Sequence, residues 1–404
     1  MIRNFRALEK YLVVLFLFLL PTQLAYHFWP SWAFVFGIRV DLLAPALYLT
    51  DILILALMFL NLNIFRSFKK YFLIILIFAA VNSLYSSSPP ESVYRWIKIV
   101  EFFFVGFYFS KQKLLDLRSI VKVLFFSLIT FSLIGIFQFV KGGTVGGLLY
   151  FLGERSFNLG TPGIALVSLN GVERLRAYST FSHPNSLAGF LGAVILFVLL
   201  SGKLKKNLFN FLGVLVILIC FLLSFSISAY LGFFLIFSFY LFSKNKKPFK
   251  WIVVAYLFLS IIGSLLLPLT SPWILRTFLL LGQNISQRFD LAYIAGRMIG
   301  QRFLVGEGLG TFIVNLPTFS WLLQPVHNVF LLVFSETGIL GLLAFCFLIY
   351  KTLINQVKTR TLYLLLPLVF ILFTGLFDHY TLTLQQNILL FGVFIGLSFN
   401  GRIA

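Results

Sequence analysis

Residues 120–140 read IVKVLFFSLITFSLIGIFQFV, an apolar run interrupted by a single charged side chain, Lys122. A helix needs about 20 mainly apolar residues to cross the hydrocarbon core of a bilayer, and this run has that length. Segments of the same character recur along the chain, at residues 11–29, 43–60, 71–86, 94–110, 184–201, 207–223, 225–243, 250–268, 328–350, 362–378 and 384–399. The chain is therefore expected to be an all-α, polytopic integral membrane protein with about twelve transmembrane helices.

The composition of the whole chain supports this prediction. Of its 404 residues, 60% are hydrophobic and 11% are charged, whereas roughly 25% of the residues of a soluble protein are charged. This content excludes an ordinary soluble enzyme, and it excludes a disordered chain, which needs low hydrophobicity. The 32 Lys and Arg outnumber the 12 Asp and Glu, for a formal net charge of +20. In so apolar a chain the excess indicates the cytoplasmic side of a membrane, and no nucleic-acid partner is expected.

The distribution of the basic residues predicts the orientation of the chain. If the N-terminus lies inside and the helices alternate, most basic residues fall in inner segments, from Arg3 to Arg402. Cytoplasmic loops carry this excess, so both termini are expected to be cytoplasmic. The first apolar run follows Arg6 and Lys10, but it lacks the small residues of a cleavage site. It is therefore expected to remain as the first helix rather than to be removed as a signal peptide.

A single membrane domain spanning residues 1–404 is expected, with its extramembrane mass on the extracytoplasmic side. The first five helices are followed by an outer loop at 141–183, helices six to nine at 184–268, a large outer loop at 269–327, and helices ten to twelve at 328–404. The connections on the inner side are short.

The loop 269–327 contains a helical pattern of its own. Leu291, Ile294, Ala295 and Met298 recur at helical spacing and predict an amphipathic helix at the outer membrane interface. The run Gly306-Glu307-Gly308-Leu309-Gly310 follows it. Because no parallel-sheet pattern surrounds these glycines, they are not expected to bind a dinucleotide, and we expect a flexible turn.

Neither a metal centre nor a cofactor is expected. Cys220 and Cys346 are the two cysteines, and both lie in apolar runs, where they are expected to be small buried hydrophobes. The four histidines form no Cys/His cluster along the sequence of the kind that binds zinc.

The end of the loop 141–183 carries the first candidate site. Arg174 and Arg176 precede His183-Pro184-Asn185, where Pro184 can occupy the first turn of a helix. An Arg guanidinium presents a fork of donors that suits a phosphate group. The alternative is a polar loop whose Arg side chains simply reach the membrane interface.

Further polar residues are expected on the same outer face. Arg288 lies in the predicted amphipathic helix, and His327, next to Asn328, lies at the mouth of the tenth helix. Histidine is the side chain best able to accept a proton near neutral pH, although an interface histidine can also have a purely structural hydrogen bond. Asp378 and His379 lie at the outer end of the eleventh helix. Arg guanidinium groups and a base beside a membrane suit a lipid-linked diphosphate donor.

Acids inside the predicted helices are expected to be structural. Glu336 lies within the tenth helix, where a carboxyl group must face the interior of the bundle. Asp51 and Glu101 are expected to pair with Arg95 or Lys98, because residues 98 and 101 are helical neighbours.

Several motifs resemble the O-antigen ligase and O-antigen polymerase superfamily. They are Phe181-Ser182-His183-Pro184-Asn185, the segment from Arg288 through Gly306-x-Gly308-x-Gly310, and His327-Asn328 followed by Glu336-x-Gly338. Pro21-Thr22-Gln23-Leu24 and Asp378-His379-Tyr380 are also similar to bacterial members. The resemblance covers roughly residues 170–350, and the order, spacing and shared outer location of the motifs make it specific.

This resemblance implies a glycosyltransferase of the bacterial inner membrane whose active site faces the extracytoplasmic side. Members take a glycan from undecaprenyl diphosphate and pass it to a hydroxyl of a lipid core or of another lipid-linked glycan, without metal and with inversion. The resemblance further implies that Arg176 and Arg288, with Arg174 a weaker candidate, hold the donor diphosphate and that His327 is the catalytic base. Supporting roles are implied for His183, Asn185, Asn328, Glu336, Asp378 and His379.

One position departs from the family pattern, because Ser226-Ile227-Ser228 stands where many members have Ser-Arg. This leaves more of the diphosphate charge to the three Arg residues. The expected function is that of an O-antigen ligase, and the polymerase of the same superfamily is the alternative. The protein-glycosylating branch ranks lower because its members often have a soluble C-terminal region, whereas this chain ends at Ala404. A twelve-helix secondary transporter is less favoured, because such proteins often have two similar halves.

Overall fold

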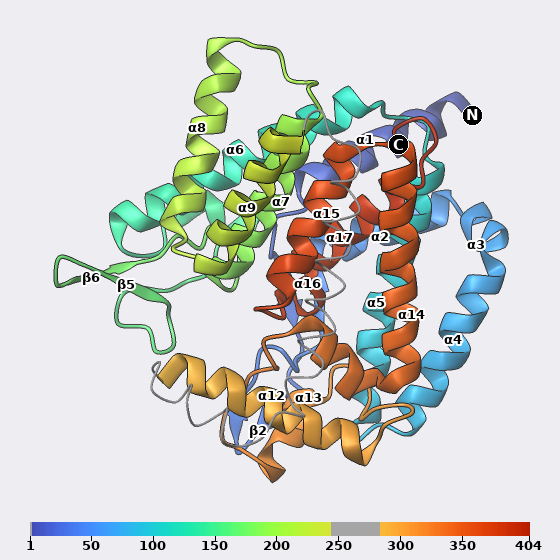
Figure 1. Ribbon diagram of the computed structural model, residues 1–404, viewed down its shortest axis with the longest axis vertical. Coiled ribbons are helices and arrows are strands. Elements are labelled where there is room, and N and C mark those ends of the chain that lie inside the picture. The colour runs from blue at the N-terminus through green and yellow to red at the C-terminus, as the bar shows by residue number, and fades with distance from the viewer. Residues whose placement is uncertain (1, 244–282) are drawn as a thin grey trace.

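The computed structural model describes residues 2–243 and 283–404 and is mostly helical, with 67% helix and 6% strand (Figure 1). The helices are α1 (Ile2–Phe18), α2 (Leu49–Leu60), α3 (Asn63–Ser67), α4 (Lys69–Leu84), α5 (Pro89–Lys111), α6 (Leu117–Lys141), α7 (Pro184–Leu200), α8 (Leu208–Leu223), α9 (Ile227–Ser243), α12 (Gln283–Gln301), α13 (Phe312–Asn315), α14 (Val329–Thr359), α15 (Leu362–Gly375), α16 (Tyr380–Thr383) and α17 (Gln385–Ser398). The short 3-10 helices are η1 (Ser31–Ala33), η2 (Gly147–Leu152) and η5 (Leu316–Thr318). The strands are β1 (Ala25–His27), β2 (Phe34–Val35), β3 (Ile38–Arg39), β4 (Ala46–Tyr48), β5 (Leu166–Leu169) and β6 (Val172–Leu175).

Helices occupy most of the predicted apolar segments. α2, α4 to α9, α14, α15 and α17 each coincide with one of them, and the predicted segment 250–268 lies outside the described residues. By length and composition, α6 and α14 are long and apolar enough to cross a membrane, and several shorter apolar helices have 10–17 residues. α14 continues beyond its predicted end at residue 350 and has one non-helical residue, Gly338.

The first predicted segment, 11–29, is wrong in its position. α1 ends at Phe18, and Ala25–His27 forms β1, which pairs antiparallel with β4. Pro21 explains the break, because a proline disfavours helical backbone at the residue before it. Thr22, which follows Pro21, lies outside the helix, and its Oγ1 donates a hydrogen bond to the carbonyl of Leu152 at 2.7 Å.

The expected all-α class needs one correction, because residues 2–243 and 283–404 also contain three two-stranded antiparallel sheets. β1 pairs with β4, β2 with β3, and β5 with β6, so each sheet joins segments that lie close together in the sequence. The strands belong to the connections between helices, and the helices form the core.

Close helix contacts hold the centre of the molecule together. A Cβ added at Gly396 in α17 would come within 2.4 Å of the carbonyl oxygen of Gly106 in α5, so these two backbones approach as closely as glycine allows. Large apolar side chains fill the same core, among them Phe190 in α7 and Phe370 in α15, and both are almost fully buried. The helices are therefore packed mainly by apolar surface.

The predicted amphipathic helix exists, but protein covers its apolar face. Leu291, Ala295 and Met298 of α12 are buried in a second apolar cluster with Val35 of the N-terminal hairpin and Phe312 of α13. The expectation that this face lies at the membrane interface is therefore wrong. The 3.6-residue period identifies an apolar face but cannot say whether lipid or protein covers it.

The glycine run 306–310 is a packed loop rather than a flexible turn. Gly306 has φ of +72°, and a Cβ there would lie 2.4 Å from the backbone of Glu336 in α14. Asn82 of α4 secures the same loop, since its Nδ2 donates to the carbonyl of Val305 at 2.7 Å and its Oδ1 accepts from the amide of Leu309 at 2.9 Å. The loop therefore joins α4 to α14.

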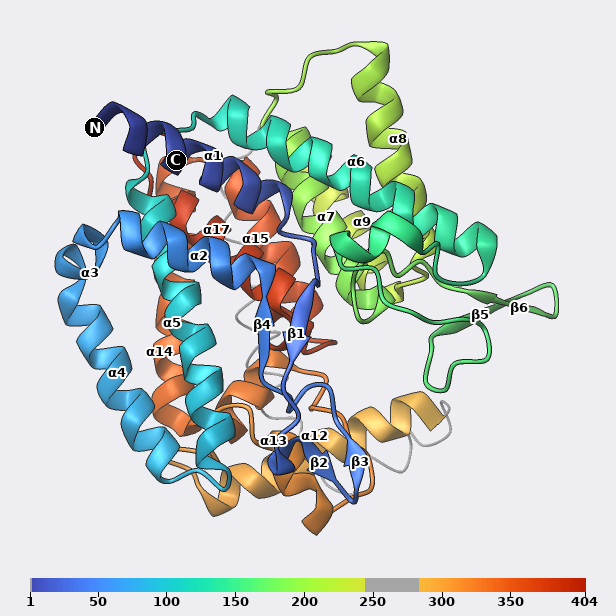
Figure 2. The same cartoon turned by 180° about the vertical axis from the view of Figure 1, so that it is seen from behind.

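Both chain termini lie at one end of the helical body, and α12 with β2 and β3 lies at the opposite end (Figures 1 and 2).

Candidate functional site: a polar cavity with a histidine cluster

A polar cavity of about 740 Å³ collects most of the predicted site residues. Its lining includes His183, Asn185, Arg288, His327, Asp378 and His379. These residues come from the start of α7, from α12, and from the segments before α14 and after α15. The volume falls in the range of roughly 300–1,000 Å³ that is typical of ligand sites.

His327 is held in place by the residue that follows it. Asn328 caps α14, because its Oδ1 accepts from the amides of Phe330 at 2.9 Å and Leu331 at 3.0 Å. Its Nδ2 donates to the carbonyl of Leu376 at 3.2 Å, which ties the start of α14 to the end of α15. The Nδ1 atom of His327 is buried and has no hydrogen-bond partner within the described part of the chain. Buried polar atoms without a hydrogen-bond partner are uncommon in folded proteins, so this nitrogen marks His327 as a residue whose role needs an explanation.

Asp378 and His379 lie directly beside His327. The rings of His327 and His379 are 5.3 Å apart between centroids, and their planes are inclined by 72°. Asp378 is buried, its Oδ1 accepts from the amide of His379 at 2.8 Å, and its Oδ2 accepts from Asn185 Nδ2 at 3.0 Å. Hydrogen bonds of this kind favour the ionised carboxylate. His379 Nδ1 lies 2.8 Å from Thr383 Oγ1.

Arg176 reaches this cluster through Asn185. Its Nη2 donates to Asn185 Oδ1 at 2.7 Å, and its Nε donates to the carbonyl of Ser224 at 2.7 Å. Asn185 then donates to Asp378, so a continuous chain of hydrogen bonds links the guanidinium to the carboxylate. His183 begins α7 as its cap, with Nδ1 accepting from the Asn185 amide at 3.1 Å. Arg176 therefore lies behind Asn185, which lines the cavity itself.

Arg288 enters the cavity from α12. Its Nη1 donates to the carbonyl of Phe377 at 2.7 Å, next to Asp378 in the sequence. Among the described residues it forms no ion pair with a carboxylate. Its charge can therefore act on an anion in the cavity.

The imidazoles of the cluster are neutral near pH 7. Burial is the main reason that the pKa values of His183 and His379 are lowered to about 4; the nearby Asp378 carboxylate opposes this shift, and the charge of Arg288 contributes to it in a smaller way. Burial followed by Arg288 also lowers the pKa of His327 below its ordinary value, although Asp378 acts in the opposite direction. Near neutral pH these rings are unprotonated, because desolvation disfavours their charged form.

Two predicted residues lie elsewhere. Arg174 is an exposed residue of β6, where its partner across the hairpin is Val167. Glu336 is buried inside α14, where its Oε1 accepts from the amide of Phe312 at 3.2 Å, and it lines a different, apolar cavity. The expected pairing of the other acids is present, since Lys98 contacts both Asp51 and Glu101.

Another part of the lining of the polar cavity was not predicted. It contains His27, Trp29, Arg39, Asp41 and Arg155. The guanidinium of Arg39 lies 4.4 Å above the Trp29 ring, the His27 ring stacks on Trp29 at 5.9 Å, and Arg155 Nη2 lies 3.1 Å from Asp41 Oδ2. The prediction placed His27 and Trp29 inside a spanning helix, and Pro21 with the polar residues Thr22 and Gln23 after it was the signal against this.

The position that departs from the family pattern lies near Arg176. Ile227 begins α9 and is 82% exposed, whereas Ser226 is buried. The neighbouring Ser224 supplies the carbonyl that holds Arg176. The tip between α8 and α9 therefore positions a guanidinium through its backbone.

The histidine cluster also has the composition of a metal site. One potential ligand atom from each of His327, Asp378 and His379 lies within 4.8 Å of the others. Two imidazoles and a carboxylate can bind a divalent transition metal. The prediction found no cluster because the two histidines are far apart in the sequence and meet only where α15 returns beside the start of α14. The side chains of this cluster can therefore transfer a proton, and they can also bind a cation.

No protein-family model and no curated protein matches this chain. The geometry of the polar cavity and the sequence motifs that line it are therefore the basis for assigning a function.

Proposed function

We propose that this protein is an O-antigen ligase-type glycosyltransferase. It moves a glycan from undecaprenyl diphosphate to an acceptor hydroxyl on the extracytoplasmic face of the bacterial inner membrane. The observation that carries the proposal is the meeting of Arg288, the Arg176–Asn185 pair and the neutral His327 around one polar cavity. These are the residues of three separate motifs that resemble the superfamily.

The proposed topology has about twelve transmembrane helices with both termini in the cytoplasm. Three features support it: the apolar helices, the concentration of basic residues in the inner segments, and the two termini at one end of the molecule. Under this topology the polar cavity belongs to the outer half of the protein.

Arg288 would bind the donor diphosphate directly, and Arg176 would add its positive charge from behind Asn185. Arg288 lines the cavity and has no carboxylate partner among the described residues, whereas Arg176 is fixed by the carbonyl of Ser224 and by Asn185. Arginine forks suit phosphate oxygens and stabilise the charge that develops as the diphosphate leaves. In this proposal the two cations supply that stabilisation without a metal ion.

His327 would act as the base. The acceptor oxygen attacks the anomeric carbon from the face opposite the diphosphate, and the carbon–oxygen bond to the diphosphate breaks with its electron pair on the leaving group. The hydroxyl proton passes to the His327 imidazole and is later released to water or to the diphosphate. Asp378 stabilises the imidazolium that forms, and Asn328 fixes the backbone that carries the ring. This displacement inverts the anomeric centre.

The nature of the acceptor separates ligase from polymerase, because both would use the same donor chemistry. The decisive experiment is mass spectrometry of the acceptor after incubation of purified protein with a polyprenyl-diphosphate glycan. We expect one glycan unit to be added to a non-donor acceptor and free polyprenyl diphosphate to appear only when that acceptor is present. Movement of unchanged glycan across sealed vesicles would contradict the proposal and indicate a transporter.

A chelator tests the proposed absence of a metal requirement. Transfer should continue at the same rate after EDTA treatment. Loss of transfer with EDTA, restored by a divalent metal, would instead assign His327, Asp378 and His379 to a metal centre.

A further inference from the structure

The geometry of His327, Asp378 and His379 allows one metal ion to contact all three side chains. One potential ligand atom from each residue lies within 4.8 Å of the others. Two ligands that each lie about 2.1 Å from a tetrahedral ion are about 3.4 Å apart, so side-chain rotations that move these atoms by about 1 Å close the site. All three residues line the polar cavity, so an ion can enter from the cavity and keep a water molecule as its fourth ligand.

The hydrogen bonds of Thr383 leave one ring nitrogen of His379 free for a metal ion. The Thr383 hydroxyl donates to the carbonyl of His379 at 3.2 Å, and the same oxygen lies 2.8 Å from His379 Nδ1. Because the hydroxyl proton is used on the carbonyl, the oxygen accepts from Nδ1–H, and Nε2 keeps its lone pair. Metal-binding histidines usually donate their other N–H in this way, which fixes the orientation of the ring.

The other two ligands also have lone pairs to offer. Each oxygen of Asp378 accepts one hydrogen bond, from the amide of His379 and from Asn185 Nδ2. A carboxylate oxygen has two lone pairs, so each oxygen keeps one for an ion. Nδ1 of His327 is buried and has no hydrogen-bond partner within the described part of the chain. A bound ion is one of the partners that satisfy such an atom.

The surroundings of these ligands select the class of ion. Arg288 donates to the carbonyl of Phe377, and Arg176 reaches Asp378 through Asn185. Two positive charges so close to one carboxylate disfavour Mg²⁺ and Ca²⁺, which depend on several oxygen ligands. Two of the three ligands are imidazoles, which suit transition metals. The ligand set therefore fits a divalent transition metal ion such as Zn²⁺.

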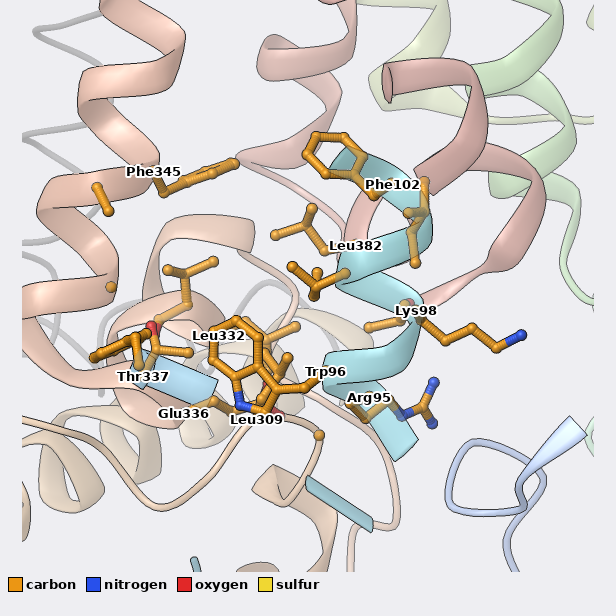
Figure 3. A pocket seen from close by; sticks show the side chains of 18 of the residues that line it. Arg95, Trp96, Lys98, Phe102, Leu309, Leu332, Glu336, Thr337, Phe345 and Leu382 are labelled. Carbon is orange, nitrogen blue, oxygen red and sulfur yellow. The ribbon is translucent and has the colours of Figure 1, made fainter. Parts of the chain in front are cut away.

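A second cavity, with a volume of about 340 Å³ between α4, α5 and α14, has no comparable ligand set. Among the described residues that line it, Glu336 is the one acid, and none is a histidine or a cysteine. Figure 3 shows the charged ends of Arg95 and Lys98 pointing away from Trp96, and both cations are paired with carboxylates. Of these two cavities, the polar one alone offers ligands for a transition metal.

We infer that His327, Asp378 and His379 bind a divalent transition metal ion from the extracytoplasmic side and that the bound ion inhibits transfer. The inhibition rests on the proposed function, whereas the binding does not. A neutral imidazole has one nitrogen lone pair, and an ion bound to His327 occupies it, so the ring can no longer take the proton of the acceptor hydroxyl. The ion also holds Asp378, which would otherwise stabilise the imidazolium.

Titration of the metal-free, full-length protein with Zn²⁺ tests the site, with purification on an affinity tag that contains no histidine. We expect one Zn²⁺ per chain, retained in excess Mg²⁺. His379→Ala should weaken this binding at least about tenfold, because a ligand is lost. His27→Ala is the matched control, because His27 lies elsewhere in the cavity lining, stacked on Trp29, and it should bind Zn²⁺ as the wild type does. Equal affinity of wild type and His379→Ala would overturn the inference, as would loss of binding in His27→Ala.

Thr383→Val tests the site with all three ligands in place. Valine keeps the branched shape of threonine but lacks the hydroxyl that orients His379. Zn²⁺ binding should weaken about tenfold, which is typical when a partner of a metal-binding histidine is removed, and circular dichroism should show an unchanged helix content. An unchanged affinity in the folded variant would contradict the assigned ligand atom of His379.

Transfer from a polyprenyl-diphosphate glycan tests the inhibition. Zn²⁺ should stop transfer over the concentration range that fills the site, EDTA should restore it, and Mg²⁺ should have no effect. In Thr383→Val, the Zn²⁺ concentration that halves transfer should rise by the same factor as the Kd for Zn²⁺. A fully occupied site without inhibition would overturn the inhibitory role. If the wild type binds Zn²⁺ as expected but transfers no glycan without metal, the proposed function fails and the metal site stands.

Discussion

At the scale of single residues, His327 makes the sharpest prediction. Its pKa is lowered by burial and, to a smaller extent, by Arg288, so the ring stays neutral to a lower pH than a histidine in water does. Transfer should therefore be constant around neutral pH and should decline as the pH falls through the lowered pKa. His327→Ala should reduce kcat by about 10² to 10⁴ and abolish this acid limb. The pH profiles of kcat for the two proteins check it, and an unchanged acid limb in the variant would assign the limb to another group.

A second prediction at the scale of single residues concerns the arginines near the polar cavity. Arg288→Ala should raise KM for the donor at least about tenfold, because a charge-assisted pair of hydrogen bonds to phosphate is lost. Arg176→Ala should raise it by a smaller factor, because Arg176 lies behind Asn185 and acts on the cavity through that residue. Arg174→Ala is the matched control, since Arg174 is exposed on a hairpin away from the polar cavity. Circular dichroism should show an unchanged helix content in all three variants. A donor KM that changes equally in the three would contradict the assignment of the diphosphate site.

At the scale of elements, the glycine loop 306–310 is predicted to stabilise the contact between α4 and α14. Gly306→Ala would force a Cβ against the backbone of Glu336 at positive φ, at a cost of about 1–3 kcal/mol. Gly300→Ala in α12 is the control, because no neighbouring atom lies within 4 Å of its added Cβ. Thermal unfolding should show a lower Tm for the first variant, and for the second an unchanged or slightly higher Tm. A Tm unchanged by Gly306→Ala would mean that the loop can move away from α14.

The elements also differ in how well they, and the site residues they carry, could be predicted from the sequence. Apolar runs located most helices, and the motifs located His183, Asn185, Arg288 and His327, because each lies at the end of an apolar run or at helical spacing. The wall of Trp29 and Asp41 was missed, since short strands and turns between helices leave no periodic signal. The motifs also named Asp378 and His379, but the sequence did not show that these two residues and His327 form a group with the composition of a metal site, because their side chains come together only when α14 and α15 pack.

At the scale of the whole molecule, the proposed orientation can be tested by the accessibility of introduced cysteines. Cys220 is buried and Cys346 is half-buried, so both would first be replaced by serine. In intact cells, a membrane-impermeant thiol reagent should label a cysteine at Trp321, which is 80% exposed, and should leave one at Lys205 unlabelled until the membrane is opened. The reason is that the basic segment around Lys205 is retained on the cytoplasmic side. Labelling of both positions in intact cells, or of Lys205 alone, would contradict an active site on the extracytoplasmic face.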